Sequence, residues 1–168
     1  CFAPGDYTSL GLLTLGADGT PFARRWARLE GDRSTHPVDL LAPQRATLKA
    51  MQMNGAAYWV LHRLTFTIGP GFEGPCIEAA PYQSSLSSDS CVYDHLLIEG
   101  CDGTGVSFMG NAGGVGQHLN NVIQKTVVHN ATPVKPMYGS EHDGVTLTAA
   151  RNLRIIDSEL GATVGLRD

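Results

Sequence analysis

Apolar and polar residues alternate in two short segments near the end of the chain. Val145 and Leu147 alternate with threonines, and Leu153 and Ile155 lie on either side of Arg154. A period of two is typical of strands with one buried face, whereas an amphipathic helix repeats about every 3.6 residues. The pattern predicts two short strands, joined by a turn at residues 148–151 and followed by a polar break at residues 157–158. We expect the four apolar side chains to point into the protein interior.

Similar segments recur upstream at nearly regular intervals. Residues 59–61, 93–98, 121–123 and 152–155 each begin with an aromatic residue or an asparagine and continue with apolar residues. Their first residues, Trp59, Tyr93, Asn121 and Asn152, are 28 to 34 positions apart. A repeat of about 20 to 50 residues indicates a solenoid or a propeller, but a propeller blade needs about 40 to 45. The shorter, uneven period favours a solenoid whose coils cover one another's apolar faces.

Two irregular segments, residues 69–90 and 131–141, interrupt this repeat. In a solenoid of strands, such insertions gather on one flank and can wall a groove along a parallel sheet. Loops on a rigid scaffold often carry binding and catalytic residues. We therefore expect the functional residues on these loops or on outward-facing strand positions beside them.

The start of the chain carries a more specific pattern. The segment APGDYTSLGLLTLGADGTPFARRWARLEGD, residues 3–32, contains a Pro-Gly-x-Tyr sequence at residues 4–7 and a Gly-Thr-Pro sequence at residues 19–21. It resembles the first turn of right-handed parallel β-helix proteins of the pectate-lyase-like superfamily, and especially the chondroitinase B and alginate lyase branch. In that family a helical cap precedes the Pro-Gly-x-Tyr segment, so we expect this chain to be a fragment of a longer solenoid.

This resemblance implies a fold and a class of function. The fold is all-β, a right-handed single-stranded parallel β-helix (a solenoid) of about five coils, with residues 1–168 forming a single domain. The implied function is that of an extracytoplasmic protein, secreted, at the cell surface or periplasmic, that acts on a polysaccharide as a lyase or a glycosidase in a groove along the sheet. The alternative is a non-catalytic β-helix that serves as an adhesin, a phage or surface fibre, or a filament subunit.

Composition limits the partners. The chain has 12 Lys and Arg against 16 Asp and Glu, a net charge of −4, which gives no general electrostatic reason to bind nucleic acid. No apolar run approaches the roughly 20 residues of a membrane-spanning helix. We therefore expect neither a nucleic-acid partner nor a membrane span. The open ends of a parallel stack are strand edges, so end-to-end self-association is also expected.

Two of the four cysteines, Cys76 and Cys91, bracket a polar loop that has no periodicity of its own. A disulfide between them would close this loop and stabilise the fold by about 3 kcal/mol on the chain-entropy estimate. Such a bridge would indicate an oxidising compartment. The alternative is that both residues are small, buried and apolar. The sequence leaves the pairing open.

The candidate catalytic residues are Glu141, His142, Asp143 and Lys125. The first three place two acids and an imidazole directly before a strand, where they can serve as general acid and base or, through their oxygens, bind calcium. Lyases that cleave uronates by β-elimination need a base and a cation, and similar enzymes use lysine, arginine or calcium for these roles. No lyase motif matches residue by residue. The alternatives are an ordinary Asp-Gly turn and a solubilising surface lysine.

Other polar residues have a structural or a functional interpretation. The pairs His62–Arg63, a polar break, and Asp94–His95 lie within predicted strands and can point outward along one groove, although hydrogen-bonded structural histidines are commoner. The glycine-rich residues 110–116 lack the Lys-Ser/Thr of a phosphate loop and are expected to form a turn. Asn121, Asn130 and Asn152 are expected to stack as side-chain ladders at the corners of a β-helix.

Overall fold

The computed structural model describes residues 3, 5–15, 27–30, 46–67, 74–79, 87–101, 104–109, 117–129, 145–147 and 149–160, with the backbone alone for residues 27–30 and 146. These residues form eighteen short strands and a three-residue 3-10 helix, η1 (Thr8–Leu10), so the predicted all-β class is confirmed. Among them, no helix has the length and apolar character to cross a membrane.

The strands form three main sheets in which every neighbouring pair is parallel. Sheet 1 has the order β1 (Gly5–Asp6), β4 (Ala46–Leu48), β7 (Leu64–Thr67), β10 (Leu97–Glu99), β14 (Val127–His129) and β18 (Glu159–Leu160). Sheet 2 has the order β2 (Leu12–Thr14), β5 (Ala50–Gln52), β8 (Ile77–Glu78), β11 (Val106–Phe108) and β15 (Val145–Leu147). Sheet 3 has the order β3 (Ala27–Glu30), β6 (Trp59–His62), β9 (Val92–Asp94), β13 (Val122–Gln124) and β17 (Arg154–Ile156). A smaller sheet pairs β12 (His118–Leu119) with β16 (Ala150–Arg151).

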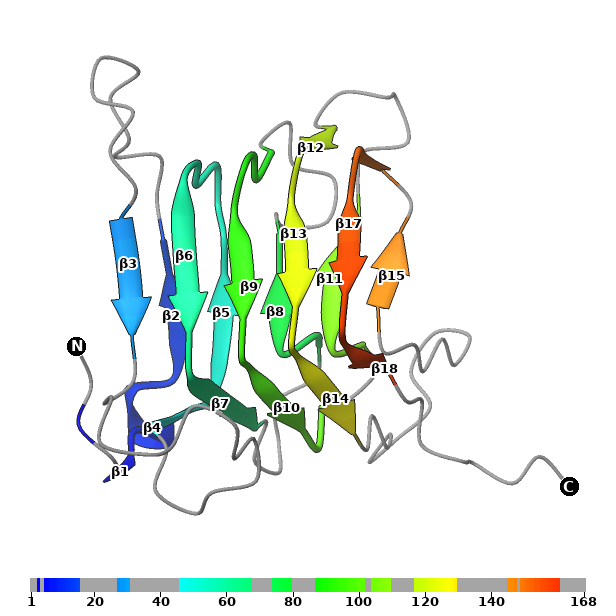
Figure 1. The fold of residues 1–168 in the computed structure, drawn as a ribbon. Coiled ribbons are helices and arrows are strands. Elements are labelled where there is room, and N and C mark those ends of the chain that lie inside the picture. The colour runs from blue at the N-terminus through cyan, green and yellow to red at the C-terminus, as the bar shows by residue number, and fades with distance from the viewer. Residues whose placement is uncertain are drawn as a thin grey trace, which may run out of the picture.

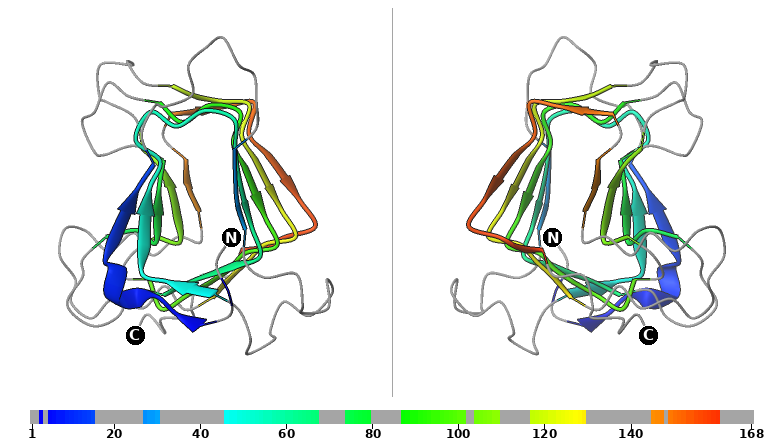
Figure 2. Two further views of the ribbon diagram at one scale, coloured as in Figure 1. Left: turned by 90° about the vertical axis from the view of Figure 1, so that its left-hand side faces the viewer. Right: turned by 90° about the vertical axis from the view of Figure 1, so that its right-hand side faces the viewer.

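The chain visits these sheets in a fixed rotation. It contributes one strand to sheet 1, one to sheet 2 and one to sheet 3, and then returns to sheet 1 beside its previous strand. We call each such passage a layer. The strands of sheet 3 lie side by side in Figure 1, and successive layers overlie one another when the molecule is viewed along the stack in Figure 2. Stacked parallel strands in this order are consistent with the predicted solenoid.

The register of sheet 3 corrects the predicted repeat. Tyr93 lies opposite Leu61 and Ile123, not opposite Trp59, and Ile123 lies opposite Ile155. Two side-chain hydrogen bonds between neighbouring layers, His62 with Asp94 and Asn120 with Asn152, accordingly join residues 32 positions apart. The sequence segments had been aligned on their first residues, but the parallel ladder aligns the positions that face the core.

The core is built from columns of apolar side chains, one from each layer. In sheet 1, Leu48, Phe66, Ile98 and Val128 follow one another in register, and all are fully buried. Each layer supplies an apolar side chain to such a column, and the layers on either side remove it from water. The stack therefore stabilises each layer through its neighbours.

The predicted inward positions near the end of the chain are only partly buried. Val145 and Leu153 pack against the core cluster. Leu147 and Ile155 are 50% and 44% exposed, although their register partners Phe108 and Ile123 are fully buried. Their register places these two residues at positions that face the core in the preceding layer, but their side chains remain about half exposed. Within the described part of the chain, β15 and β17 have a neighbouring strand on one side alone, so one face of each of these side chains remains uncovered.

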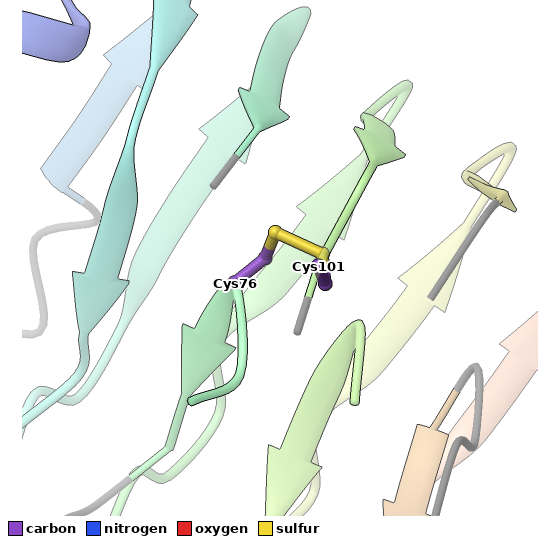
Figure 3. Close-up of a disulfide and its surroundings, with 2 residues drawn as sticks. All are labelled: Cys76 and Cys101. Carbon is purple, nitrogen blue, oxygen red and sulfur yellow. A yellow bond between two sulfur atoms is a disulfide. The ribbon is translucent and has the colours of Figure 1, made fainter. Parts of the chain in front are cut away.

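The cysteine pairing also differs from the one weighed in the sequence. Cys76 is bonded to Cys101, at a sequence separation of 25 and with 5.4 Å between their Cα atoms. The bridge joins the residue before β8 to a residue between β10 and β11, and thus ties two adjacent layers together (Figure 3). Cys91 is a buried free thiol. Burial raises the pKa of this thiol, because the thiolate would lose its hydration.

The asparagines divide into two roles. Asn152 donates its side-chain amide to Asn120 in the layer before, 3.2 Å away, so the pair at this corner contains Asn120 in place of the predicted Asn121. Asn121 is buried instead: its Oδ1 accepts the Cys91 N–H and its Nδ2 donates to the Ser88 carbonyl. It therefore satisfies two buried backbone groups of the adjacent layer. Asn130 lies outside the described residues.

Candidate functional site

Of the four predicted catalytic residues, the structure describes Lys125 alone. Glu141, His142 and Asp143 lie outside the described residues, as do residues 110–116. Lys125 is described: it is exposed and forms the turn between β13 and β14. The catalytic role predicted for these four residues is therefore untested, and the described chemistry centres on the layer next to Lys125.

Turns between sheet 3 and sheet 1 share one geometry in four successive layers. The residue that directly follows the strand of sheet 3 has positive φ in each layer, with φ between 46° and 55°; these residues are Arg63, His95, Lys125 and Asp157. The backbone N–H of each of the first three donates to the carbonyl of the residue before the turn in the next layer, over 3.0–3.1 Å. The break predicted at His62–Arg63 is confirmed, and it is one position of a stacked corner. We call these four residues the corner ridge.

His62, Asp94 and His95 come together at this ridge. His62 and Asp94 end β6 and β9 and lie opposite each other in the parallel ladder, while His95 is the turn residue that follows Asp94. Nδ1 of His62 lies 2.7 Å from Asp94 Oδ2, and Nδ1 of His95 lies 2.7 Å from Asp94 Oδ1. Since an ionised carboxylate is an acceptor alone, both imidazoles donate to it. The two rings are edge to face, with centroids 5.4 Å apart.

The Asp94 carboxylate is partly buried, but its neighbours stabilise its ionised form. Burial by itself would raise the pKa of Asp94, because it disfavours the charged form. Hydrogen bonds from Gln124 and His95, and the charges of His95 and His62, act in the opposite direction and hold the pKa below its ordinary value. Gln124 is the register partner of Asp94 in the following layer. Three layers thus contribute to fixing one carboxylate as an anion.

Basic residues border this cluster along the stack. Arg63 and Lys125 occupy the ridge positions in the layers before and after His95. The Nε atom of Arg63 is buried and has no hydrogen-bond partner among the described residues. A desolvated donor without an acceptor costs free energy, which an anionic ligand or a water molecule would recover. The fourth ridge residue, Asp157, is acidic, so the basic part of the ridge ends at Lys125.

The donor set of this cluster does not match calcium, which the sequence suggested for residues 141–143, outside the described part of the chain. Calcium takes six to eight oxygen ligands at about 2.3–2.6 Å. The described side chains here offer one carboxylate and two imidazoles, whose ligand atoms lie within 4.8 Å of one another. Imidazole nitrogen suits zinc and similar ions instead.

Two other histidines have structural surroundings. His118 is buried, accepts the Ser88 N–H at Nδ1 over 2.9 Å and lies 3.1 Å from the Met109 carbonyl through Nε2. His129 pairs with Glu159 over 3.1 Å at the surface. His118 therefore has a structural role, whereas His129 belongs to an exposed surface pair.

Part of this site was visible in the sequence. The sequence predicts a polar break at His62–Arg63 and places Asp94–His95 within a strand, with both pairs able to face one groove; His62 and Asp94 are 32 positions apart. A correct register would have placed Asp94 directly beside His62. The predicted alignment on Trp59 and Tyr93 placed the two strands two residues out of phase, so it missed this contact.

Searches of protein-family models, curated proteins and solved structures found no match to this chain. The parallel all-β stack is therefore established from the structure, and the likeness to pectate-lyase-like proteins remains a prediction from residues 3–32.

Proposed function

We propose that this chain is a right-handed parallel β-helix of the pectate-lyase-like type and that it engages an acidic polysaccharide along the corner ridge. Support for the fold comes from the fixed rotation of the chain through three parallel sheets and from the sequence pattern of the first layers. Support for the ligand comes from the chemistry of the ridge.

One observation carries the proposal: Arg63, His95 and Lys125 occupy the same turn position in three consecutive layers. Parallel strands stack about 4.8 Å apart, which is close to the length of one sugar unit in a linear polysaccharide. A chain of uronate residues lying along the stack would present one carboxylate to each layer. The ridge offers two cations and an imidazole at that repeat, whereas the protein as a whole is acidic. The basic ridge is therefore a local feature suited to an anionic chain.

The same residues fit elimination better than hydrolysis. In β-elimination a base removes the proton from C5 of the uronate, the electron pair forms the C4–C5 double bond, and the C4–O bond breaks with protonation of the leaving oxygen. Arg63 would neutralise the uronate carboxylate, and Lys125 would carry the proton from C5 to the leaving oxygen. A glycosidase commonly needs two carboxyl groups about 5 to 10 Å apart. The described side chains of the cluster contain one, Asp94.

An extracytoplasmic location is part of the proposal. The Cys76–Cys101 bridge supports it, because structural disulfides persist in oxidising compartments and are rare in the cytosol. A polysaccharide substrate would be encountered in the same compartments.

The test uses a panel of polyuronates and neutral polysaccharides, with ultraviolet absorbance for unsaturated products, a reducing-end assay and a binding measurement. We expect absorbance to rise with a polyuronate and not with neutral chains. Lys125→Asn is the informative variant, because asparagine tolerates positive φ better than lysine and the fold should be unharmed. It should bind polyuronate at least fivefold more weakly and lose most turnover.

Two results would decide against parts of this proposal. Binding without products would support the non-catalytic alternative, an adhesin or fibre segment that recognises the same polymer. Equal binding of neutral and acidic chains, or unchanged binding by Lys125→Asn, would show that the corner ridge is not the recognition surface.

A further inference from the structure

The His62–Asp94–His95 cluster has the composition of a transition-metal site. Two imidazoles and one carboxylate come from two adjacent layers, and one ligand atom from each lies within 4.8 Å of the other two. Zinc that contacts a substrate or water commonly has three protein ligands and an open fourth position. We propose that this cluster binds a single divalent ion of the zinc type, with one imidazole nitrogen from each histidine and an oxygen of Asp94 as ligands.

The two carboxylate–imidazole pairs are already near coordination distance, and the two imidazole nitrogens lie within 4.8 Å of each other. Each histidine now donates to Asp94 over 2.7 Å. Two ligands of one tetrahedral zinc ion, at bond lengths of about 2.0–2.1 Å, are about 3.3 Å apart. The ion would replace the two hydrogen bonds, and each donor–acceptor pair would open by about half an ångström. The side chains of His62 and Asp94 are 9% and 14% exposed and that of His95 is 16% exposed, so an ion can enter from solvent while most of the site is dry.

The surroundings also hold the ligands in place. Gln124 hydrogen-bonds to Asp94 from the following layer, as outer partners of metal-bound carboxylates commonly do. Backbone hydrogen bonds fix the turns on both sides: Arg63 N–H donates to the Asp94 carbonyl and His95 N–H to the Gln124 carbonyl, each over 3.1 Å. The two histidines and the aspartate are thus attached to a rigid corner and not to a long loop.

The ion would lie between Arg63 and Lys125 along the ridge, and this part of the inference rests on the proposed function. Neighbouring positive charges weaken the binding of a cation, and a uronate carboxylate placed between them relieves that repulsion. Zinc and an acidic oligosaccharide should therefore bind cooperatively. By thermodynamic linkage, each must raise the affinity of the other by the same factor.

Calorimetric titration of the full chain, first treated with a chelator, tests the site with the metal alone. We expect one Zn²⁺ per chain and no comparable binding of Ca²⁺. Co²⁺ should bind at the same position and give visible absorption bands of a low-coordinate site. His95→Asn keeps a residue that tolerates the positive φ, and His62→Gln keeps a polar residue at the end of β6. Each should weaken Zn²⁺ binding at least tenfold.

His129→Asn is the matched control, because His129 also pairs with a carboxylate, Glu159, on the surface of the same stack. It should leave the zinc affinity unchanged. Absence of Zn²⁺ binding by the unmodified chain, or equal loss of affinity in all three histidine variants, overturns the inference.

A second titration, with an oligouronate in the presence and absence of Zn²⁺, separates the metal site from the proposed function. A threefold or larger increase in oligouronate affinity with Zn²⁺ supports cooperative binding. Zinc binding with no effect on the oligouronate confirms the ion site and refutes its part in polysaccharide recognition. Oligouronate binding without zinc binding refutes the ion site and leaves the proposed function intact.

Discussion

Removal of the Cys76–Cys101 bridge should be one of the most destabilising changes available in this chain. The cross-link closes a loop of 25 residues. On the chain-entropy estimate, such a loop lowers the entropy of the unfolded state enough to stabilise the fold by about 3.5 kcal/mol. Both sulfur atoms are buried, so Cys76→Ala with Cys101→Ala also removes apolar contacts, at about 1 kcal/mol for each residue. The expected loss in the free energy of unfolding is therefore about 5 kcal/mol.

Urea denaturation followed by tryptophan fluorescence measures this loss. With a urea slope of about 2–3 kcal/mol/M, the midpoint should fall by about 2 M in the double variant. Cys91→Ala is the control: it removes a buried sulfur but no cross-link, and it should cost about 1 kcal/mol. A double variant that resembles this control would show that the bridge contributes little.

Peptide mapping under non-reducing conditions checks the pairing itself. The structure requires a linked peptide pair that contains Cys76 and Cys101, with Cys91 recovered as a free thiol. A Cys76–Cys91 peptide would refute the layer-to-layer link and restore the pairing that the polar loop had suggested.

Three further predictions concern the core. Asn121→Ala should cost about 2–4 kcal/mol in urea unfolding, since it leaves two buried backbone groups without partners, and a loss below about 1 kcal/mol would contradict this role. Ile123→Val should cost about 1 kcal/mol, whereas the same change at its half-exposed register partner Ile155 should cost less than about 0.5; equal thermal shifts would mean that the two sites are equally packed. The raised pKa keeps the Cys91 thiol protonated at pH 8, so iodoacetamide should modify it only after unfolding, and rapid modification of the folded protein would place Cys91 at the surface.

Much of the local structure could be read from the sequence because it depends on neighbouring residues. Alternation of apolar and polar positions predicted strands at residues 145–147 and 152–156, where the structure has Val145–Leu147 and Arg154–Ile156; residues 150–151, predicted as part of a turn, form β16. The polar pair His62–Arg63 correctly marked the break between β6 and β7. The repeat of roughly 30 residues indicated layers that bury one another's faces. These features follow from period-two burial and from the need of each layer for a neighbour.

Only the tertiary structure decided which residues of different layers meet. Layers differ in length, so a repeat counted from the first residue of each segment slips by one or two positions, and a slip changes every contact between layers. The parallel ladder fixed the register and thereby placed Asp94 beside His62 and Asn121 against Ser88. It likewise selected Cys101 as the partner of Cys76, and it left Ile155 half exposed although its sequence pattern matches that of a buried strand. Burial and pairing depend on which residues lie in the next layer, some 30 positions away in sequence. The pattern within one segment carries no information about those residues.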